Sequence, residues 1–335
     1  MFKRWFLLGL ILSAGITIGW FSRYFYVHNI RVRPPGQTAN AMVRQKTDYA
    51  FISPLLACGF SENKPSRAYK VLETAIEGVL DTKKSADNAS DASVYFRDLT
   101  TGNWTGINEN IQYTPASLLK IPVMIAYFKA AETNANLLPH QIEYRGDFNE
   151  NGQQIIKPSE VLVIGKLYTV EELIKRMIVD SDNNAEDLLL NYIDQDYLVE
   201  VFSDLSLNPH VFSENTNGQV VSAKSFSFVF RILYNATYLD KDMSEKALGL
   251  LTQASFDKGI TAGVPSDIKV AHKFGERTYA SQVGTLISRE LHECGIVYAP
   301  SKPYLLCVMT KGSDFTKSED LIASISNIVY NTVTH

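Results

Sequence analysis

The sequence predicts an α+β fold in which helices flank an antiparallel sheet and an all-helical lobe is inserted into the chain. Strand-like segments lie at 94–107 and again beyond 268. Between them, the region of roughly 112–255 is mostly helical by its hydrophobic pattern. Strands on both sides of a run of helices form one lobe, and the helices form a second lobe beside it. We therefore expect the functional site in a cleft between the two lobes.

The composition is that of an ordinary globular protein. The chain has 335 residues, of which 45% are hydrophobic and 20% are charged, and its formal net charge is -4. This length allows one large domain or two lobes. A mildly acidic chain without a basic stripe gives no support to a nucleic-acid partner. The histidines and cysteines lack H-E-x-x-H and C-x-x-C spacing, so we expect no metal ion and no cofactor.

The first 22 residues predict a membrane anchor. Lys3 and Arg4 precede an apolar run over 5–21. That length is at the short end of a spanning helix, about 17 to 25 residues. A cleaved signal peptide is the alternative, with cleavage near 13–15. The apolar run continues past that point, which favours an uncleaved anchor over 1–22.

A stalk and a folded domain follow the anchor. Pro34, Pro35 and Gly36 lie in a short polar stretch, so we interpret residues 23–48 as a stalk. The folded domain then covers 49–335. Basic residues stand on both sides of the apolar run, so the charge pattern does not specify the orientation in the membrane.

Local signals predict the first elements of the folded domain. Apolar residues recur at helical spacing over 65–80 and predict a helix. Segments at 94–99 and 104–107 flank a polar turn and predict a hairpin. Farther along the chain, Thr169 and Glu172 form a capping box that opens another helix.

Strand-like sequence returns near the C-terminus, over 268–273, 279–291 and 304–309. A second capping box, Thr316 with Glu319, predicts the start of the last helix. The apolar residues on one face of this helix are Leu321, Ile322, Ile325, Ile328 and Val329.

Three short motifs follow one another along the chain: Ser117-Leu118-Leu119-Lys120, Ser181-Asp182-Asn183 and Lys273-Phe274-Gly275. Each is weak alone, because such short combinations are common. Together they supply a nucleophile with a nearby amine, a second hydroxyl with an amide, and a second amine on a strand. This set suits acyl transfer by a serine nucleophile.

The first motif explains how a serine becomes nucleophilic. Ser117 and Lys120 are three residues apart on a predicted helix, so the hydroxyl and the amine share a face. Lysine acts as a base only when burial or a second cation lowers its pKa, and Lys273 is the candidate cation. Taken singly, each motif has a simpler interpretation: an exposed Lys120, an ordinary helix cap at Ser181, and a charged strand end.

In kind and order, the three motifs resemble those of penicillin-recognising serine enzymes, above all class A β-lactamase-like hydrolases. The resemblance covers the chain from about residue 53 onward. It implies that Ser117 is the acylated nucleophile, Lys120 its amine partner and Ser181 a proton shuttle. It further implies an oxyanion hole formed by the backbone N–H groups of Ser117 and Glu276. It also implies that Lys273 is a catalytic residue that binds the substrate carboxylate. The implied substrate-binding residues are Asn183, Phe274 and Gly275.

Two departures from the family pattern concern turnover. Phe274 stands where the family has a Thr or Ser hydroxyl. No E-x-x-L-N string, whose Glu activates the deacylating water in class A enzymes, lies between Asn183 and Lys273. The nearest string is at 214–217, where Glu214 is a weak candidate base. Acylation is therefore expected, whereas the acyl-enzyme can persist.

The resemblance also implies substrates and a location. β-Lactams, or the D-alanyl stem peptides of peptidoglycan that they mimic, are the expected substrates. The anchored catalytic domain is then expected outside the cytoplasmic membrane, as a monomer. A D,D-peptidase or penicillin-binding protein with slow deacylation is one alternative. A catalytically idle cell-wall binding protein is another.

Cys294 and Cys307 lie symmetrically about a turn at Pro300 and Ser301. If the flanking strands form a tight hairpin, the two cysteines face each other and either form a disulfide or remain buried thiols. Directly opposed Cβ atoms are often farther apart than a disulfide prefers, which favours the thiols. His272 alternates to the opposite face of its strand from Lys273, so we expect a structural role for it.

Overall fold

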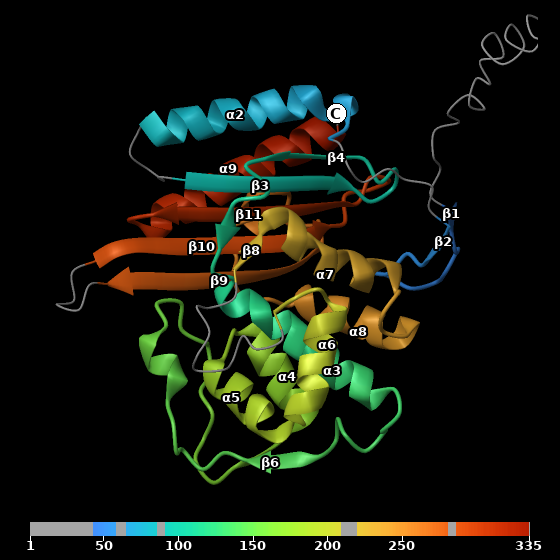
Figure 1. The fold of residues 1–335 in the computed structure, drawn as a ribbon, viewed down its shortest axis with the longest axis vertical. Coiled ribbons are helices and arrows are strands. Elements are labelled where there is room, and N and C mark those ends of the chain that lie inside the picture. The colour runs from blue at the N-terminus through green and yellow to red at the C-terminus, as the bar shows by residue number, and fades with distance from the viewer. Residues whose placement is uncertain (1–42, 58–64, 86–90, 209–219, 281–285, 335) are drawn as a thin grey trace, which may run out of the picture. The chain divides into compact units, whose positions relative to one another are not determined.

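The computed structural model describes residues 43–57, 65–85, 91–208, 220–280 and 286–334 (Figure 1). The predicted anchor, most of the predicted stalk, and Glu214 lie outside these ranges. Within the described ranges, no helix has both the length and the apolar character that crossing a bilayer requires.

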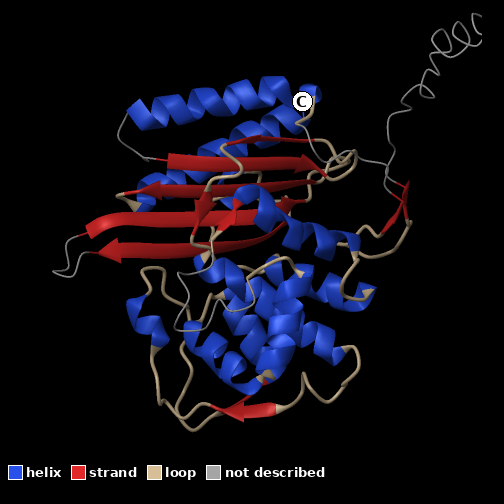
Figure 2. Ribbon diagram, viewed as in Figure 1, coloured by secondary structure: helices blue, strands red, loops and turns tan. Residues whose placement is uncertain are grey.

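A five-stranded antiparallel sheet organises one lobe, in the order β4-β3-β11-β10-β9 (Figures 1 and 2). The predicted first hairpin is confirmed as β3 and β4. Its strands and those that complete the sheet are β3 (Asp91–Asp98), β4 (Trp104–Ile107), β9 (Val270–Ala280), β10 (Leu286–Val297) and β11 (Tyr304–Gly312).

The prediction of one strand over 279–291 is wrong. Its first residues end β9, the rest begin β10, and the two strands pair antiparallel, with Ala280 opposite Leu286. Gly284 is the strongest turn signal between them, and a single glycine within alternating sequence also fits a continuous strand. The sequence pattern therefore did not reveal the reversal.

Helices cover both faces of this sheet. Figure 1 shows α9 behind the strands and α7 in front of them, and α2 (Lys70–Ser85) packs along α9. The last helix, α9, spans Phe315–Thr334, one residue earlier than the predicted capping box. The Asp314 carboxylate accepts the Thr316 N–H, so the N-cap residue of α9 is Asp314 and not the predicted Thr316. Its predicted apolar stripe is buried against the sheet, apart from the half-buried Ile328.

The inserted lobe is helical, as predicted, and lies beside β9. The Thr169 hydroxyl accepts the Glu172 N–H, which confirms the predicted N-cap of α4. The helices of the region are α3 (Lys120–Ala131), α4 (Val170–Val179), α5 (Asn183–Tyr192), α6 (Gln195–Asp204), α7 (Ala223–Asn235) and α8 (Lys241–Leu251).

Short elements complete the described chain. Four are 3₁₀ helices: η1 (Arg67–Tyr69), η2 (Ala116–Leu119), η3 (Glu150–Gln153) and η4 (Thr261–Gly263). The others form two-stranded ribbons: β1 (Val43–Arg44) with β2 (Leu55–Ala57), β5 (Gln112–Tyr113) with β8 (Val221–Ser222), and β6 (Gln141–Glu143) with β7 (Leu167–Thr169).

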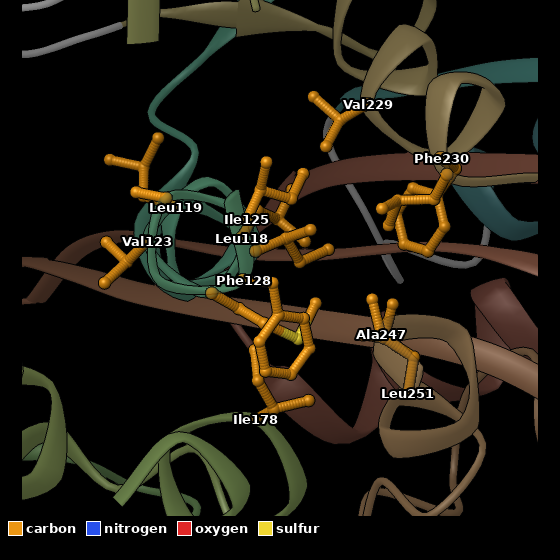
Figure 3. Close-up of a cluster of buried hydrophobic side chains, with 14 of the residues drawn as sticks. Leu118, Leu119, Val123, Ile125, Phe128, Ile178, Val229, Phe230, Ala247 and Leu251 are labelled. Atoms are coloured by element: carbon orange, nitrogen blue, oxygen red, sulfur yellow. The ribbon is translucent and has the colours of Figure 1, made fainter. Parts of the chain in front are cut away.

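The α3 helix forms the centre of the larger hydrophobic core. Its side chains are apolar on nearly every side, and such a helix is stable only when it is surrounded. Figure 3 shows Phe128 of α3 close to Ile178 of α4, with Phe230 and Leu251 contributed by α7 and α8. Because residues of β10 and β11 join the same cluster, this core fixes the helical lobe against the sheet.

Cys294 and Cys307 form a disulfide between β10 and β11. The two residues are direct register partners, and their Cα atoms are 4.0 Å apart. The preference for two buried thiols was therefore wrong. The sequence correctly placed the cysteines opposite each other, but the spacing of two opposed strands is set by the ladder of the whole sheet.

Replacing Phe128 by Ala should lower the free energy of unfolding by about 3–5 kcal/mol, because the ring is fully buried and leaves a cavity. Urea unfolding measures this change. Phe228→Ala on α7 is the matched control, since that ring is 37% exposed and its loss should cost well under half as much. Equal losses for the two variants would contradict the assigned core.

Candidate active site

The three motifs meet where the sheet faces the helical lobe. The strand β9 is the edge of the sheet on this side, and η2 packs against it (Figure 1). Ser117 lies in η2, Lys273 lies on β9, and Ser181 lies in the loop between α4 and α5. Tertiary structure thus joins residues that are up to 156 positions apart in the sequence (273 minus 117).

Ser117 lies in the 3₁₀ turn η2, whereas the sequence predicts that it shares one α-helix with Lys120. The α3 helix begins at Lys120. Pro122 explains the difference, because it has no amide hydrogen to donate to the preceding turn and therefore belongs near a helix start. Ala116, just before the serine, has a left-handed φ of 50°. Such a conformation is costly for a residue with a Cβ, and surrounding contacts must maintain it.

Gly275 permits β9 to approach the backbone of Ser117. A Cβ at Gly275 would lie 2.7 Å from the Pro115 carbonyl oxygen and 3.1 Å from the Ser117 nitrogen. Only glycine fits this contact without moving the 3₁₀ turn. The predicted oxyanion donors, the backbone N–H groups of Ser117 and Glu276, thereby come from two segments in direct contact.

Lys120 is completely buried at the base of the site. Its Nζ donates to the Ser181 carbonyl at 2.6 Å, to the Ser181 hydroxyl at 3.2 Å, and to the Asn183 side-chain oxygen. Burial lowers the pKa of this amine, while the nearby carboxylates of Glu186 and Asp182 oppose the shift. A buried amine with a lowered pKa can accept a proton from a neighbouring hydroxyl.

Lys273 brings a second buried amine to the same hydroxyl. Its Nζ donates to Ser181 Oγ at 2.9 Å and to the Phe274 carbonyl at 3.0 Å. Burial is the main cause that holds the pKa of Lys273 well below its usual value, and the nearby Lys120 charge is the second cause. One serine hydroxyl therefore contacts both amines, and it is suited to pass a proton between them and a substrate.

The Ser181 loop is held in an unusual conformation. Ser181 has a left-handed φ of 58°. Asp182 caps α5 by accepting the backbone N–H groups of Asn184 and Ala185. The Asn151 side chain donates to the Asp182 carboxylate and accepts the Asn183 N–H, both at 2.8 Å. Fixed contacts on both sides therefore position the hydroxyl of Ser181.

Phe274 is almost completely buried, at 2% exposure. Its ring stacks on Phe256 at a centroid distance of 4.7 Å, within the core between the sheet and α9. The Lys273 Nζ also lies 4.2 Å from the ring centroid. The side chain thus supplies an apolar wall and a cation–π contact beside the amine where a hydroxyl would otherwise stand. Its assignment to substrate binding stays a prediction.

A segment that the sequence analysis missed crosses this region. We call residues 149–157 the strap. The Glu276 side chain accepts the backbone N–H groups of Ile155 and Ile156 at 2.8 and 2.9 Å. At the other side, the Gln154 amide donates to the Ser181 carbonyl at 2.9 Å. The strap therefore links β9 to the Ser181 loop, and no local sequence pattern signals such a bridge.

Glu186 is a further site residue that the sequence analysis missed. Its Oε2 lies 3.6 Å from Lys120 Nζ, and its side chain is 18% exposed. Burial raises the pKa of this carboxyl, whereas Lys120 and Lys273 oppose the rise. A signal was present, because Glu186 is three residues after Asn183 and shares its helix face.

His272 points away from the amines, as its alternation predicted. Its Nδ1 lies 2.6 Å from the Glu293 carboxylate, which also accepts the Ile260 N–H. Among the residues that the structure describes, no group of three His, Cys, Asp or Glu side chains could hold a metal ion.

The chain is similar to known proteins in its sequence pattern and in its fold. The family model for the β-lactamase enzyme family matches residues 71–333. PBP-A is 20% identical over 80% of this chain and 98% of its own, with a TM-score of 0.61. A β-lactamase from Sphaerobacter thermophilus is 18% identical over 78% of this chain and 97% of its own, with a TM-score of 0.64. A class A β-lactamase from Mycobacterium abscessus is 19% identical over 78% of this chain and 100% of its own, with a TM-score of 0.62. No curated protein matches the chain.

These solved structures share the predicted fold of an antiparallel sheet with a helical lobe beside it. The predicted fold class is thereby confirmed. At this level of identity the likeness concerns the fold, and the roles of individual side chains rest on the geometry described above.

Gly275→Ala should slow the labelling of Ser117 by an acylating probe about 10²-fold, the loss expected when one oxyanion donor is displaced. Intact mass spectrometry against time measures the labelling rate. Gly78→Ala is the control, because a Cβ at that position in α2 meets nothing within 4 Å. An unchanged rate in a folded Gly275→Ala variant would refute the close contact.

Lys273→Met should stabilise the protein by about 1–4 kcal/mol, because an ammonium group is replaced by an apolar side chain of similar size. In the wild type, the unfolded chain binds the Lys273 proton at pH values where the folded chain does not. The free energy of unfolding should therefore rise with pH up to about the ordinary lysine pKa of 10.5.

Urea unfolding across this pH range measures both effects, and the slope should be smaller in the variant. Lys258→Met, at a lysine that is 66% exposed, should change stability by less than about 0.5 kcal/mol. Marked destabilisation by Lys273→Met would show that the buried amine is a net stabilising group.

Proposed function

The chain belongs to the β-lactamase enzyme family of serine hydrolases that act through an acyl-enzyme, and from this premise we propose that Ser117 is acylated by β-lactams or by D-alanyl peptides. One observation carries the proposal. Two buried amines, Lys120 and Lys273, donate to the single hydroxyl of Ser181 beside the turn that bears Ser117. This arrangement can move a proton from a nucleophile to a leaving group.

Acylation would proceed by general-base catalysis. Lys120, in its neutral form, takes the Ser117 proton, and the serine oxygen attacks the substrate carbonyl carbon. The backbone N–H groups of Ser117 and Glu276 stabilise the oxyanion that develops. The proton then passes from Lys120 through Ser181 Oγ to the departing nitrogen, along the contact of 3.2 Å between Nζ and Oγ.

Lys273 would act on the substrate through the Ser181 hydroxyl. Its Nζ is buried and already donates to two oxygens. We propose that the Ser181 hydroxyl lies between this amine and the substrate carboxylate and that Lys273 orients that hydroxyl. The Phe274 ring beside Lys273 keeps water away from the amine, which strengthens its electrostatic effect on the substrate.

A long-lived acyl-enzyme is the favoured form of this activity. The sequence between Asn183 and Lys273 lacks the E-x-x-L-N string, so the usual base for the deacylating water is missing. A PBP-A mutant forms an acyl-enzyme with penicillin G on the same fold, which supports this view. A D,D-peptidase or penicillin-binding protein is therefore a second candidate beside a β-lactamase.

The N-terminal sequence supports a location for this activity. We propose that residues 1–22 anchor the chain in the cytoplasmic membrane, that 23–48 form a stalk and that 49–335 form a monomeric catalytic domain outside it. The apolar run after Lys3 and Arg4 supports the anchor. Stem peptides of peptidoglycan would then lie within reach of the site.

The test uses the full chain in detergent and its Ser117→Ala variant, with a fluorescent penicillin and a chromogenic cephalosporin. We expect a covalent adduct on the wild type at Ser117, with a lifetime of minutes or longer, and none on the variant. Intact mass and peptide mapping locate the adduct. Rapid cephalosporin turnover would instead identify a β-lactamase, and no reaction with either probe would refute acylation by β-lactams.

A further inference from the structure

A carboxylate from α5 contacts the amine that would activate Ser117. Glu186 Oε2 lies 3.6 Å from Lys120 Nζ, and both groups are largely removed from water. The other partners of Lys120 Nζ, on Ser181 and Asn183, are neutral oxygens. Neutral oxygens hold an ammonium group but cannot take its proton at neutral pH. Glu186 is thus placed to act on the protonation state of Lys120.

We propose that Glu186 is the proton acceptor for Lys120, so that the amine becomes neutral before it deprotonates Ser117. The inference rests on the proposed acylation of Ser117 and names a residue that the three motifs do not contain. Because Glu186 acts through Lys120, it is a positioning residue for the proton.

The environment allows the proton to move between the two groups. Burial disfavours the charged form of each partner, raising the pKa of Glu186 and lowering that of Lys120. Attraction between the charges opposes both shifts. The two groups therefore titrate as one coupled unit. The Lys120 charge also lowers the pKa of Lys273, so the two amines do not readily carry a charge at the same time.

The proposed steps balance in protons and electron pairs. First, the Lys120 ammonium gives a proton to the Glu186 carboxylate, leaving an amine and a carboxylic acid. The amine lone pair then takes the Ser117 proton as the serine oxygen bonds to the carbonyl carbon, whose π electrons move to the oxygen. Next, the oxyanion re-forms the C=O bond as the C–N bond breaks, and the departing nitrogen, which keeps the electrons of that bond, receives the proton of the new ammonium through Ser181. Finally, Glu186 returns its proton to Lys120.

Several charged groups surround this pair. Asp187 is the neighbour of Glu186 on α5 itself, and its carboxylate accepts a hydrogen bond from Asn191. The titratable groups that act on Glu186 or Lys120 from the structure around them are Lys273 and Glu276 of β9, Asp182 of the Ser181 loop, and Asp187. On the strap side, Glu150 acts on Asp187.

The pH dependence of acylation distinguishes this role from a structural one. In the wild type, the neutral Lys120 amine becomes available once the Lys120–Glu186 pair holds one proton or none. The acid limb, which is the rise of the labelling rate at low pH, therefore starts at the lower pKa of the pair. In Glu186→Gln, Lys120 must lose its own proton to solvent. The profile of labelling rate against pH should therefore become a single step at the pKa of Lys120 alone, in place of the two-step rise of the coupled pair.

The experiment follows fluorescent-penicillin labelling of Ser117 from pH 5 to 10 in the full chain. Asp187→Asn is the matched control, because it removes the same charge from the same turn while leaving the Lys120 contact in place, and its limb should stay within about half a unit of wild type. Glu186→Asp should keep the wild-type limb with a lower rate. Thermal unfolding verifies that each variant folds. A two-step profile that persists in Glu186→Gln would overturn the proposal.

A second readout is independent of acylation. The Lys120 amine is titrated by ¹³C NMR in protein labelled at lysine Cε, with the signal assigned from a Lys120→Arg variant. Removal of the Glu186 charge should lower the pKa of Lys120, and an unchanged titration would contradict the inference. If the wild type forms no adduct, the proposed function fails, and this titration alone still decides whether Glu186 controls the Lys120 proton.

Discussion

Two lysine side chains share one serine hydroxyl in a part of the protein that excludes water. Removing an ammonium ion from water costs several kcal/mol, and only fixed partners can compensate for it. At an effective dielectric constant of 20, an ion pair like that of Lys120 with Glu186 gains about 4 kcal/mol. Attraction and desolvation are therefore of similar size, and the site can hold a lysine that gives up its proton.

The rest of the site serves to maintain this arrangement. The Ser181 loop adopts a left-handed conformation, and Asn151 fixes the residues that follow it. Gly275 lets the edge strand press against the turn that carries Ser117. The strap connects β9 to the Ser181 loop across this region, so the two walls of the site are coupled. Such coupling keeps donors and acceptors in place when a substrate binds.

Some structural features could be predicted from the sequence because they depend on side chains close together along the chain. The Thr169 cap, the first hairpin and the apolar stripe of the last helix follow from side chains within a few positions of one another. The antiparallel pairing of β9 with β10 was missed because a single glycine in the sequence does not distinguish a turn from a strand interior. The disulfide between Cys294 and Cys307 depends on the distance between strands, which no local pattern specifies.

For the site, the sequence by itself determined the chemical groups: a serine with an amine three residues later, a second hydroxyl and amide, and a second amine followed by glycine. Their order was sufficient to indicate the fold and the enzyme family. Only the tertiary structure decided that both amines meet at Ser181, that Glu186 approaches Lys120, and that the strap bridges the two walls. These contacts join distant segments, and the packing of the helical lobe on the sheet sets their distances.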